Sequence, residues 1–62
     1  MNYLTWDEIH VKDVIYDTVN KECITIHLKS YNVYCQKMFV GKSENCDTIT
    51  TRVFDEKRYT RC

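Results

Sequence analysis

Residues 23–29 read Cys-Ile-Thr-Ile-His-Leu-Lys, and this stretch is the clearest structural signal in the chain. Ile24, Ile26 and Leu28 alternate with more polar residues, which is the period of a β-strand with one buried face. The composition agrees with this reading. Val, Ile and Thr account for 18 of the 62 residues, whereas Leu occurs twice and Ala is absent. Because β-branched side chains suit a pleated surface and strong helix formers are nearly missing, the stretch predicts a sheet-rich domain.

The sequence downstream of this strand alternates between apolar runs and turn-forming residues. The strands and turns that we expect are a turn at 30–32, a strand at 33–40, a loop at 41–45 that holds the only Gly, a strand at 46–54, a charged turn at 55–58 and a short edge strand at 59–62. Short connections of this kind join antiparallel neighbours. We therefore expect the C-terminal forty residues to form an antiparallel meander.

The first 22 residues allow two interpretations. Thr5 and Glu8 have the spacing of a helix capping box, and Leu4 and Ile9 match the accompanying hydrophobic staple. In the other interpretation, residues 9–11 and 14–16 alternate as short strands, and a turn at 19–22 leads into Cys23.

The fold expected for this single domain, residues 1–62, is therefore a small disulfide-stabilised all-β domain with an antiparallel meander of about four to five short strands. The alternative is an α+β domain, in which an N-terminal helix over residues 5–20 packs on a three- to four-stranded antiparallel sheet.

Four cysteines, at positions 23, 35, 46 and 62, are many for so short a chain. Close pairs of thiols, which structural zinc sites and redox sites use, are absent. A chain of this size buries little apolar surface, so we expect two disulfides to supply much of its stability. A tight turn at 31–32 would place Cys23 and Cys46 both opposite Val40. This register suggests the pairs Cys23–Cys46 and Cys35–Cys62.

The charges balance at nine basic and nine acidic residues. A neutral total argues against a dedicated nucleic-acid binder and against simple adsorption to anionic membranes. The balance hides an asymmetry: residues 1–22 carry five acidic and two basic groups, and residues 23–62 carry four acidic and seven basic groups.

No apolar run is long enough for a membrane span, so we expect no membrane insertion. No signal peptide is visible, and in a secreted protein Met1 would be a remnant of expression.

We find no catalytic constellation in the sequence. Gly41-Lys42-Ser43 resembles the end of a phosphate-binding loop, but the motif needs a second glycine five positions before Gly41, where Gln36 stands. His10 and His27 have no Ser or Cys nearby to serve as a nucleophile. We therefore expect a protein that is not an enzyme and that holds no cofactor and no metal ion.

Two groups of residues are candidates for contact with a partner protein. The first is rich in aromatic rings, which are enriched at interfaces, and consists of Tyr31, Tyr34, Lys37 and Phe39. The second is basic and consists of Arg52, Lys57, Arg58 and Arg61. The alternatives are that Phe39 and one Tyr belong to the core, and that residues 57–58 form an ordinary charged turn.

The leading functional hypothesis is a secreted, non-enzymatic protein-binding or inhibitor module of the venom, salivary or immune-evasion type, which engages a host or prey protein outside the cell. The disulfide framework and the missing catalytic residues motivate it. The second hypothesis is an intracellular small regulatory protein of viral or phage type with reduced cysteines. A lesser alternative is a small nucleic-acid-binding β-barrel that stacks bases on Tyr31, Tyr34 and Phe39, although the neutral charge makes nucleic acid an unlikely partner.

Overall fold

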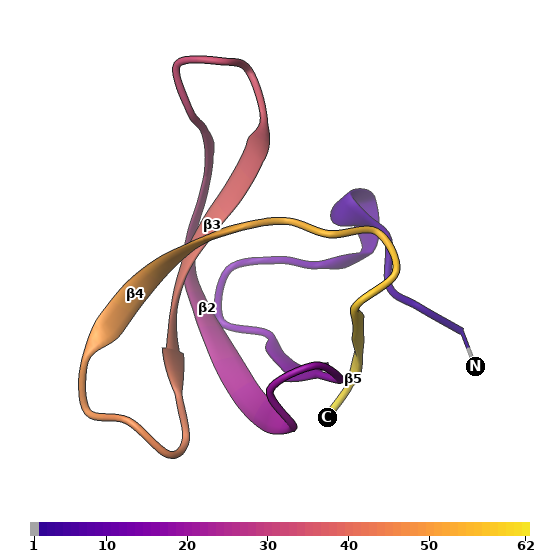
Figure 1. Ribbon diagram of the computed structural model, residues 1–62, viewed down its shortest axis with the longest axis vertical. Coiled ribbons are helices and arrows are strands. Elements are labelled where there is room, and N and C mark those ends of the chain that lie inside the picture. The colour runs from indigo at the N-terminus through magenta and orange to yellow at the C-terminus, as the bar shows by residue number, and fades with distance from the viewer. Residues whose placement is uncertain (1) are drawn as a thin grey trace.

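Five strands form one antiparallel sheet in the computed structural model, which describes residues 2–62 (Figure 1). The elements in chain order are a 3-10 helix η1 (Trp6–Glu8) and the strands β1 (Val14–Asp17), β2 (Glu22–Tyr31), β3 (Lys37–Ser43), β4 (Ile49–Val53) and β5 (Tyr59–Arg61). The spatial order is β4-β3-β2-β1-β5. Strands β2, β3 and β4 form the meander that was expected for the C-terminal forty residues, and β1 extends it. The expectation fails at β5, which crosses back to pair with β1 rather than with β4. The all-β prediction is confirmed.

The alternative of a helix over residues 5–20 is wrong. The capping box is present, because the Glu8 carboxylate accepts a hydrogen bond of 2.8 Å from the Thr5 N–H, but it caps only the single turn of η1. Lys12 then adopts a positive φ of 78°, which a helix does not allow. Its N–H donates to the Ile26 carbonyl, and the Asp13 carbonyl accepts from the Ile26 N–H. Pairing with β2 replaces the local bonds of a helix here.

A β-bulge divides β2 into two halves that face different ways. The register with β3 shifts between Ile26 and Leu28. As a result Ile24 and Ile26 are buried, whereas Leu28 is 54% exposed. The prediction that Leu28 shares their face is wrong, because the extra residue of a bulge reverses the alternation beyond it. The same reversal turns Lys29 inward, where its ammonium group donates to the carbonyls of Trp6 and Ile9 at 2.9 and 2.8 Å.

The β2–β3 hairpin is longer than expected and projects from the rest of the molecule (Figure 1). Residues 30 and 31 belong to β2 rather than to a turn, and the chain reverses at residues 33–35. Gly41 lies within β3 rather than in a loop. A Cβ at Gly41 would come within 2.7 Å of the Ile24 Cγ2 and 2.8 Å of the Thr25 carbonyl oxygen, so glycine permits the close approach of β2.

The core lies between one face of the sheet and the N-terminal segment that crosses it. The Leu4 N–H donates to the Tyr59 carbonyl at 2.7 Å, which fixes this segment beside β5. Trp6 meets Phe54 edge to face at a centroid distance of 5.3 Å. The buried apolar residues are Leu4, Trp6, Ile9, Ile15, Ile24, Ile26, Phe39, Phe54 and Tyr59.

One disulfide, Cys23–Cys62, links β2 to the end of the chain, with Cα atoms 5.9 Å apart. Cys35 and Cys46 are free and exposed. The predicted pairs Cys23–Cys46 and Cys35–Cys62 are therefore wrong. Their physical basis was a turn placed too early: the observed register sets Leu28, not Cys23, opposite Val40. This places Cys35 at the end of the hairpin, far along β2 from Cys23.

A charged turn at residues 56–58 precedes β5, as the sequence predicted, and β5 lies at an edge of the sheet. Among the described residues, none of the helical structure has the length and apolar character that a membrane crossing requires.

Candidate functional site

A buried carboxylate organises the base of the sheet, at the end opposite the projecting hairpin. Asp17 ends β1 and is completely buried. Its two carboxylate oxygens accept hydrogen bonds of 2.8 Å each from the Nε and Nη2 of Arg58. Its Oδ1 also accepts from the backbone N–H groups of Val19 and Asn20 at 2.9 and 3.2 Å. Burial is the largest influence on the pKa of Asp17 and acts to raise it, but these hydrogen bonds outweigh burial and lower it.

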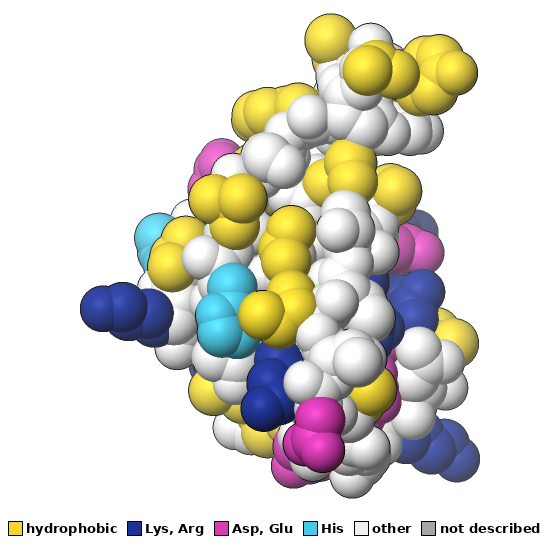
Figure 2. Space-filling model, turned by 90° about the vertical axis from the view of Figure 1, so that its left-hand side faces the viewer, with side chains coloured by type: hydrophobic (Ala, Val, Ile, Leu, Met, Phe, Trp, Pro, Cys, Tyr) yellow, Lys and Arg dark blue, Asp and Glu magenta, His cyan; other side chains and the backbone are white. Residues whose placement is uncertain are grey.

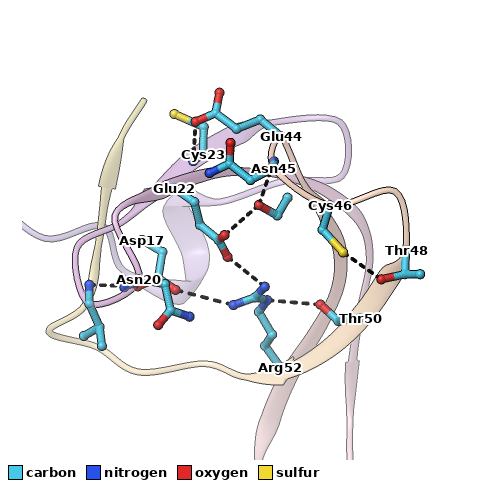
Figure 3. A network of polar contacts seen from close by, with 12 residues as sticks. Asp17, Asn20, Glu22, Cys23, Glu44, Asn45, Cys46, Thr48, Thr50 and Arg52 are labelled. Atoms are coloured by element: carbon cyan, nitrogen blue, oxygen red, sulfur yellow. Dashed lines mark hydrogen bonds and ion pairs between the residues drawn. The ribbon is translucent and has the colours of Figure 1, made fainter.

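The network continues through Arg52 to the adjoining strands (Figure 3). Arg52 of β4 approaches Asp17 at 3.4 Å and donates to the Glu22 carboxylate at 2.9 Å. Glu22 in turn accepts a hydrogen bond of 2.7 Å from the Ser43 hydroxyl of β3. These contacts join acidic groups of residues 1–22 to basic groups of the later chain. The charge asymmetry between the two parts of the sequence is thus expressed as ion pairs within the fold.

The charged and hydrogen-bonding groups of this network are satisfied by one another, which suits a structural role rather than catalysis. It also corrects part of the predicted basic group. Arg52 and Arg58 are paired and largely covered, with side-chain exposures of 19% and 25%. They do not form a free basic loop. Lys57 and Arg61 are exposed, and their role in partner binding remains a prediction.

The other end of the β2–β3 hairpin carries exposed apolar side chains. We call Val33, Tyr34 and Cys35 the hairpin tip. Val33 is 89% exposed and Tyr34 is 81% exposed. Figure 2 shows hydrophobic side chains gathered at this projecting end, above the body of the molecule. Adjacent exposed apolar groups on a protrusion are a feature of interaction surfaces.

Asn32 holds the hairpin tip in one conformation. Its side-chain oxygen accepts from the N–H groups of Tyr34 and Gln36 at 2.8 and 3.0 Å, and its amide nitrogen donates to the Gln36 side chain at 2.7 Å. The Cys35 N–H closes the turn on the Asn32 carbonyl at 3.0 Å. Cys35 itself has a positive φ of 61°. This is the geometry of a three-residue hairpin loop, in which a turn is followed by a left-handed residue.

The structure separates the predicted aromatic group. Tyr34 lies in the hairpin tip, and Tyr31 lies beside it on β2, 61% exposed with its ring 6.0 Å from that of Trp6. Lys37 is exposed and pairs with Tyr31 in the sheet register. Phe39 is completely buried, so its place in a partner-binding surface is wrong. The core alternative is correct for Phe39 but not for a Tyr of this group, because Tyr31 and Tyr34 are both exposed. Side chains on β3 alternate between the two faces of the sheet, so Phe39 points inward and its neighbours Met38 and Val40 point outward.

Sequence reasoning missed Val33 and Asn32, and it assigned Cys35 to a disulfide rather than to this surface. A usable signal was present, because Asn favours the first position of a turn through side-chain bonds to the backbone two residues on. If Asn32 is taken as the start of the turn rather than its centre, the loop consists of the three residues between Asn32 and Gln36.

The two free thiols lie at opposite ends of β3. Cys35 belongs to the hairpin tip, and Cys46 lies in the loop between β3 and β4. The Cys46 sulfur is 2.9 Å from the Thr48 hydroxyl (Figure 3), and this hydrogen bond lowers the pKa of the thiol from its ordinary value of 9.0. The separation along β3 excludes a disulfide between these two residues within this fold.

Comparisons with protein-family models, with curated proteins and with solved structures find no match to this chain.

Proposed function

We propose that this chain is a non-enzymatic protein-binding module that contacts its partner through the hairpin tip, together with the neighbouring Tyr31 and Lys37. The observation that carries the proposal is the exposure of Val33 and Tyr34 on a projecting turn that is held by hydrogen bonds. Apolar side chains in this position contribute nothing to the core of their own domain. Contact with another protein would remove their surface from water.

The fixed conformation of the tip favours binding. Association normally has to order loops and side chains, at a cost of about 0.5–1.5 kcal/mol for each immobilised side chain. Here the Asn32 side chain already bonds two backbone N–H groups of the loop. The backbone therefore needs little ordering when a partner arrives. Tyr adds a large contact area with few rotatable bonds, which is why it is frequent among residues that dominate binding energy.

The Cys23–Cys62 disulfide supports a location outside the reducing cytosol. Together with the projecting tip it supports the secreted form of the proposal, in which a stapled module of the venom, salivary or immune-evasion type blocks or engages a host or prey protein. Lys57 and Arg61, which are exposed, remain candidates for a second contact.

The exposed thiols of Cys35 and Cys46 favour a second candidate, an intracellular regulatory protein of viral or phage type. Exposed free thiols react readily in an oxidising compartment and are stable in a reducing one. Mass spectrometry after alkylation of the native protein separates the two candidates. One disulfide in protein isolated from its source supports the extracellular form, and four alkylated thiols support the intracellular form.

The experiment that tests the hairpin tip is a capture comparison between matched variants. Wild-type protein, the double variant Val33→Ser/Tyr34→Ser and the control Val19→Ser are immobilised and exposed to host plasma and to cell extract. Val19 is 64% exposed in the turn between β1 and β2, so the control removes a similar apolar group at the other end of the molecule.

We expect a protein that is retained by wild type and by the control and is lost from the double variant. Titration of that protein should show binding weakened by at least about tenfold, the equivalent of roughly 1.4 kcal/mol, in the double variant. Equal retention by all three baits would contradict the role of the tip.

A further inference from the structure

The two edges of the sheet differ in how they are protected. β5 forms one edge, and the N-terminal segment covers it through the hydrogen bond of 2.7 Å from the Leu4 N–H to the Tyr59 carbonyl. β4 forms the other edge and pairs with β3 alone among residues 2–62. In Figure 1 it lies at the margin of the sheet, with no described segment beyond it. An open edge presents unpaired backbone groups that can add another strand.

The residues of β4 that present these groups follow from the ladder with β3. The Phe54 N–H donates to the Lys37 carbonyl at 2.8 Å, and in an antiparallel ladder bonded pairs alternate with non-bonded pairs. With the observed register, the backbone of Arg52 then bonds that of Phe39, and the backbone of Thr50 bonds that of Gly41. The backbone N–H and C=O groups of Ile49, Thr51 and Val53 point away from β3, to the open edge.

Three of the usual safeguards against edge pairing, namely Lys, Pro and a bulge, are missing from β4. Natural edge strands carry Lys, Pro, bulges or inward charges that prevent association. Here the strand reads Ile-Thr-Thr-Arg-Val, with no Pro. Its one charged residue, Arg52, does point inward, but its charge is compensated by Asp17 and Glu22 of the same chain. No free charge therefore opposes the approach of a second strand along this edge.

The open groups of β4 are also self-complementary. They lie at three alternate residues centred on Thr51, so a two-fold axis at Thr51 pairs each set of donors with the acceptors of an identical strand. Thr51 then faces the partner's Thr51, and Ile49 faces the partner's Val53. Ile49 and Val53 are 56% and 51% exposed, and such β-branched cross-strand pairs stabilise a sheet. Figure 2 looks onto the side of the molecule on which β4 lies, where hydrophobic side chains and uncharged white surface cover much of the middle of the face.

We propose that β4 is a homodimerisation edge: two copies of this chain pair their β4 strands antiparallel about Thr51 and form one continuous sheet. Two backbone hydrogen bonds form at each facing pair, at Ile49 with the partner's Val53, at Thr51 with the partner's Thr51 and at Val53 with the partner's Ile49. The hairpin tips take no part in the pairing, so the dimer presents two of them. The proposal is independent of what the tip binds.

The test uses the full chain in a Cys35→Ser/Cys46→Ser background, which excludes dimers made by the exposed thiols. Sedimentation velocity from micromolar to millimolar concentration measures the mass. We expect it to rise from the monomer value of 7.5 kDa towards twice that value. Thr51→Pro removes a donor that faces the open edge, and Thr51→Lys sets two like charges opposite each other. Both should raise the dissociation constant at least about tenfold.

Asn45→Lys is the matched control, because Asn45 is exposed in the loop before β4 and the substitution adds the same charge away from the edge. It should dimerise as the parent does. Amide hydrogen exchange locates the contact: exchange at Ile49, Thr51 and Val53 should slow with concentration, whereas Thr50 and Arg52, already bonded to β3, should not change. A parent that stays monomeric, a Thr51→Lys variant that dimerises normally, or a dimer without this alternate protection would overturn the proposal.

Discussion

The two ends of the β2–β3 hairpin differ in an unusual way: a charged group is buried at the base, and apolar groups are exposed at the tip. At its base a carboxylate, Asp17, is completely buried, and the Cys23–Cys62 disulfide ties β2 to the chain end. At its tip Val33 and Tyr34 are almost fully exposed. A polar group is buried stably only where its hydrogen bonds are satisfied, and exposed apolar groups are retained where stability does not depend on them. The base therefore holds the fold, and the tip is free to serve binding.

The substitution with the largest expected effect removes the buried charge at the base. Asp17→Asn leaves Arg58 without its carboxylate partner and should destabilise the domain by about 3–5 kcal/mol, as is typical when one member of a buried pair is removed. Urea denaturation followed by tryptophan fluorescence from Trp6 measures the change. Asp7→Asn, at an exposed carboxylate of η1, should change the free energy of unfolding by less than about 0.5 kcal/mol. Equal effects of the two substitutions would show that the base does not depend on Asp17.

The same carboxylate predicts a dependence on pH. The folded state lowers the pKa of Asp17 below its ordinary value of 3.8, so this group stabilises the fold above that pH. The stabilisation should disappear as the pH falls from about 3.8 through the folded pKa. The free energy of unfolding of wild type should therefore approach that of Asp17→Asn in acid. A difference that stays constant down to pH 2 would contradict the assignment.

Removal of the disulfide should have an effect of similar size. The cross-link joins residues 39 apart in sequence, and the chain-entropy model gives about 4 kcal/mol for a loop of this length. Cys62→Ser should lower the free energy of unfolding by about this amount, and reductant should then have no further effect. Cys35→Ser, at a free thiol, is the control and should leave stability and its response to reductant unchanged.

A smaller loss is expected at Gly41, where β2 approaches β3 closely. Gly41→Ala places a methyl group within 2.7 Å of the Ile24 Cγ2 and 2.8 Å of the Thr25 carbonyl oxygen, so β2 and β3 must separate locally. We expect a destabilisation of about 1–3 kcal/mol, the range for overpacking a core. Lys42→Ala, at the next and exposed position of β3, should have little effect. A neutral Gly41→Ala would mean that the strands can adjust without loss.

The smallest of these changes should stabilise the protein. Cys35 has a φ of 61°, a region that costs residues with a Cβ about 1–2 kcal/mol but costs glycine little. Because glycine also loses more freedom on folding, we expect Cys35→Gly to raise the free energy of unfolding by about 0.5–1 kcal/mol. Cys35→Ala keeps the Cβ and should give no gain. A gain with alanine as well would assign the effect to the thiol rather than to the backbone.

The sequence predicted the class of fold but not its details. Alternation in residues 23–26, the turn at 56–58 and the edge strand at 59–61 were readable, because each is a local property of the chain. The bulge in β2 was not readable. It reverses the faces of Leu28 and Lys29, and a periodic pattern contains no mark for one extra residue.

The cysteine partners were predicted wrongly for a related reason. The cysteine pairing depended on the hairpin register, and the turn was placed at 31–32 instead of 33–35. One displaced turn shifts every cross-strand neighbour. For the candidate site, Tyr34 could be found from its residue type. The partnership of Arg52 and Arg58 with Asp17 joins residues 35 and 41 positions apart, and no local signal specifies such contacts.

Urea denaturation of the Val33→Ser/Tyr34→Ser variant tests the division between base and tip most directly. If the tip serves binding alone, the free energy of unfolding should lie within about 0.5 kcal/mol of the wild-type value, as for ordinary surface substitutions. A loss of more than about 2 kcal/mol would show that these side chains stabilise the fold itself, and it would contradict the assignment of the hairpin tip to partner binding.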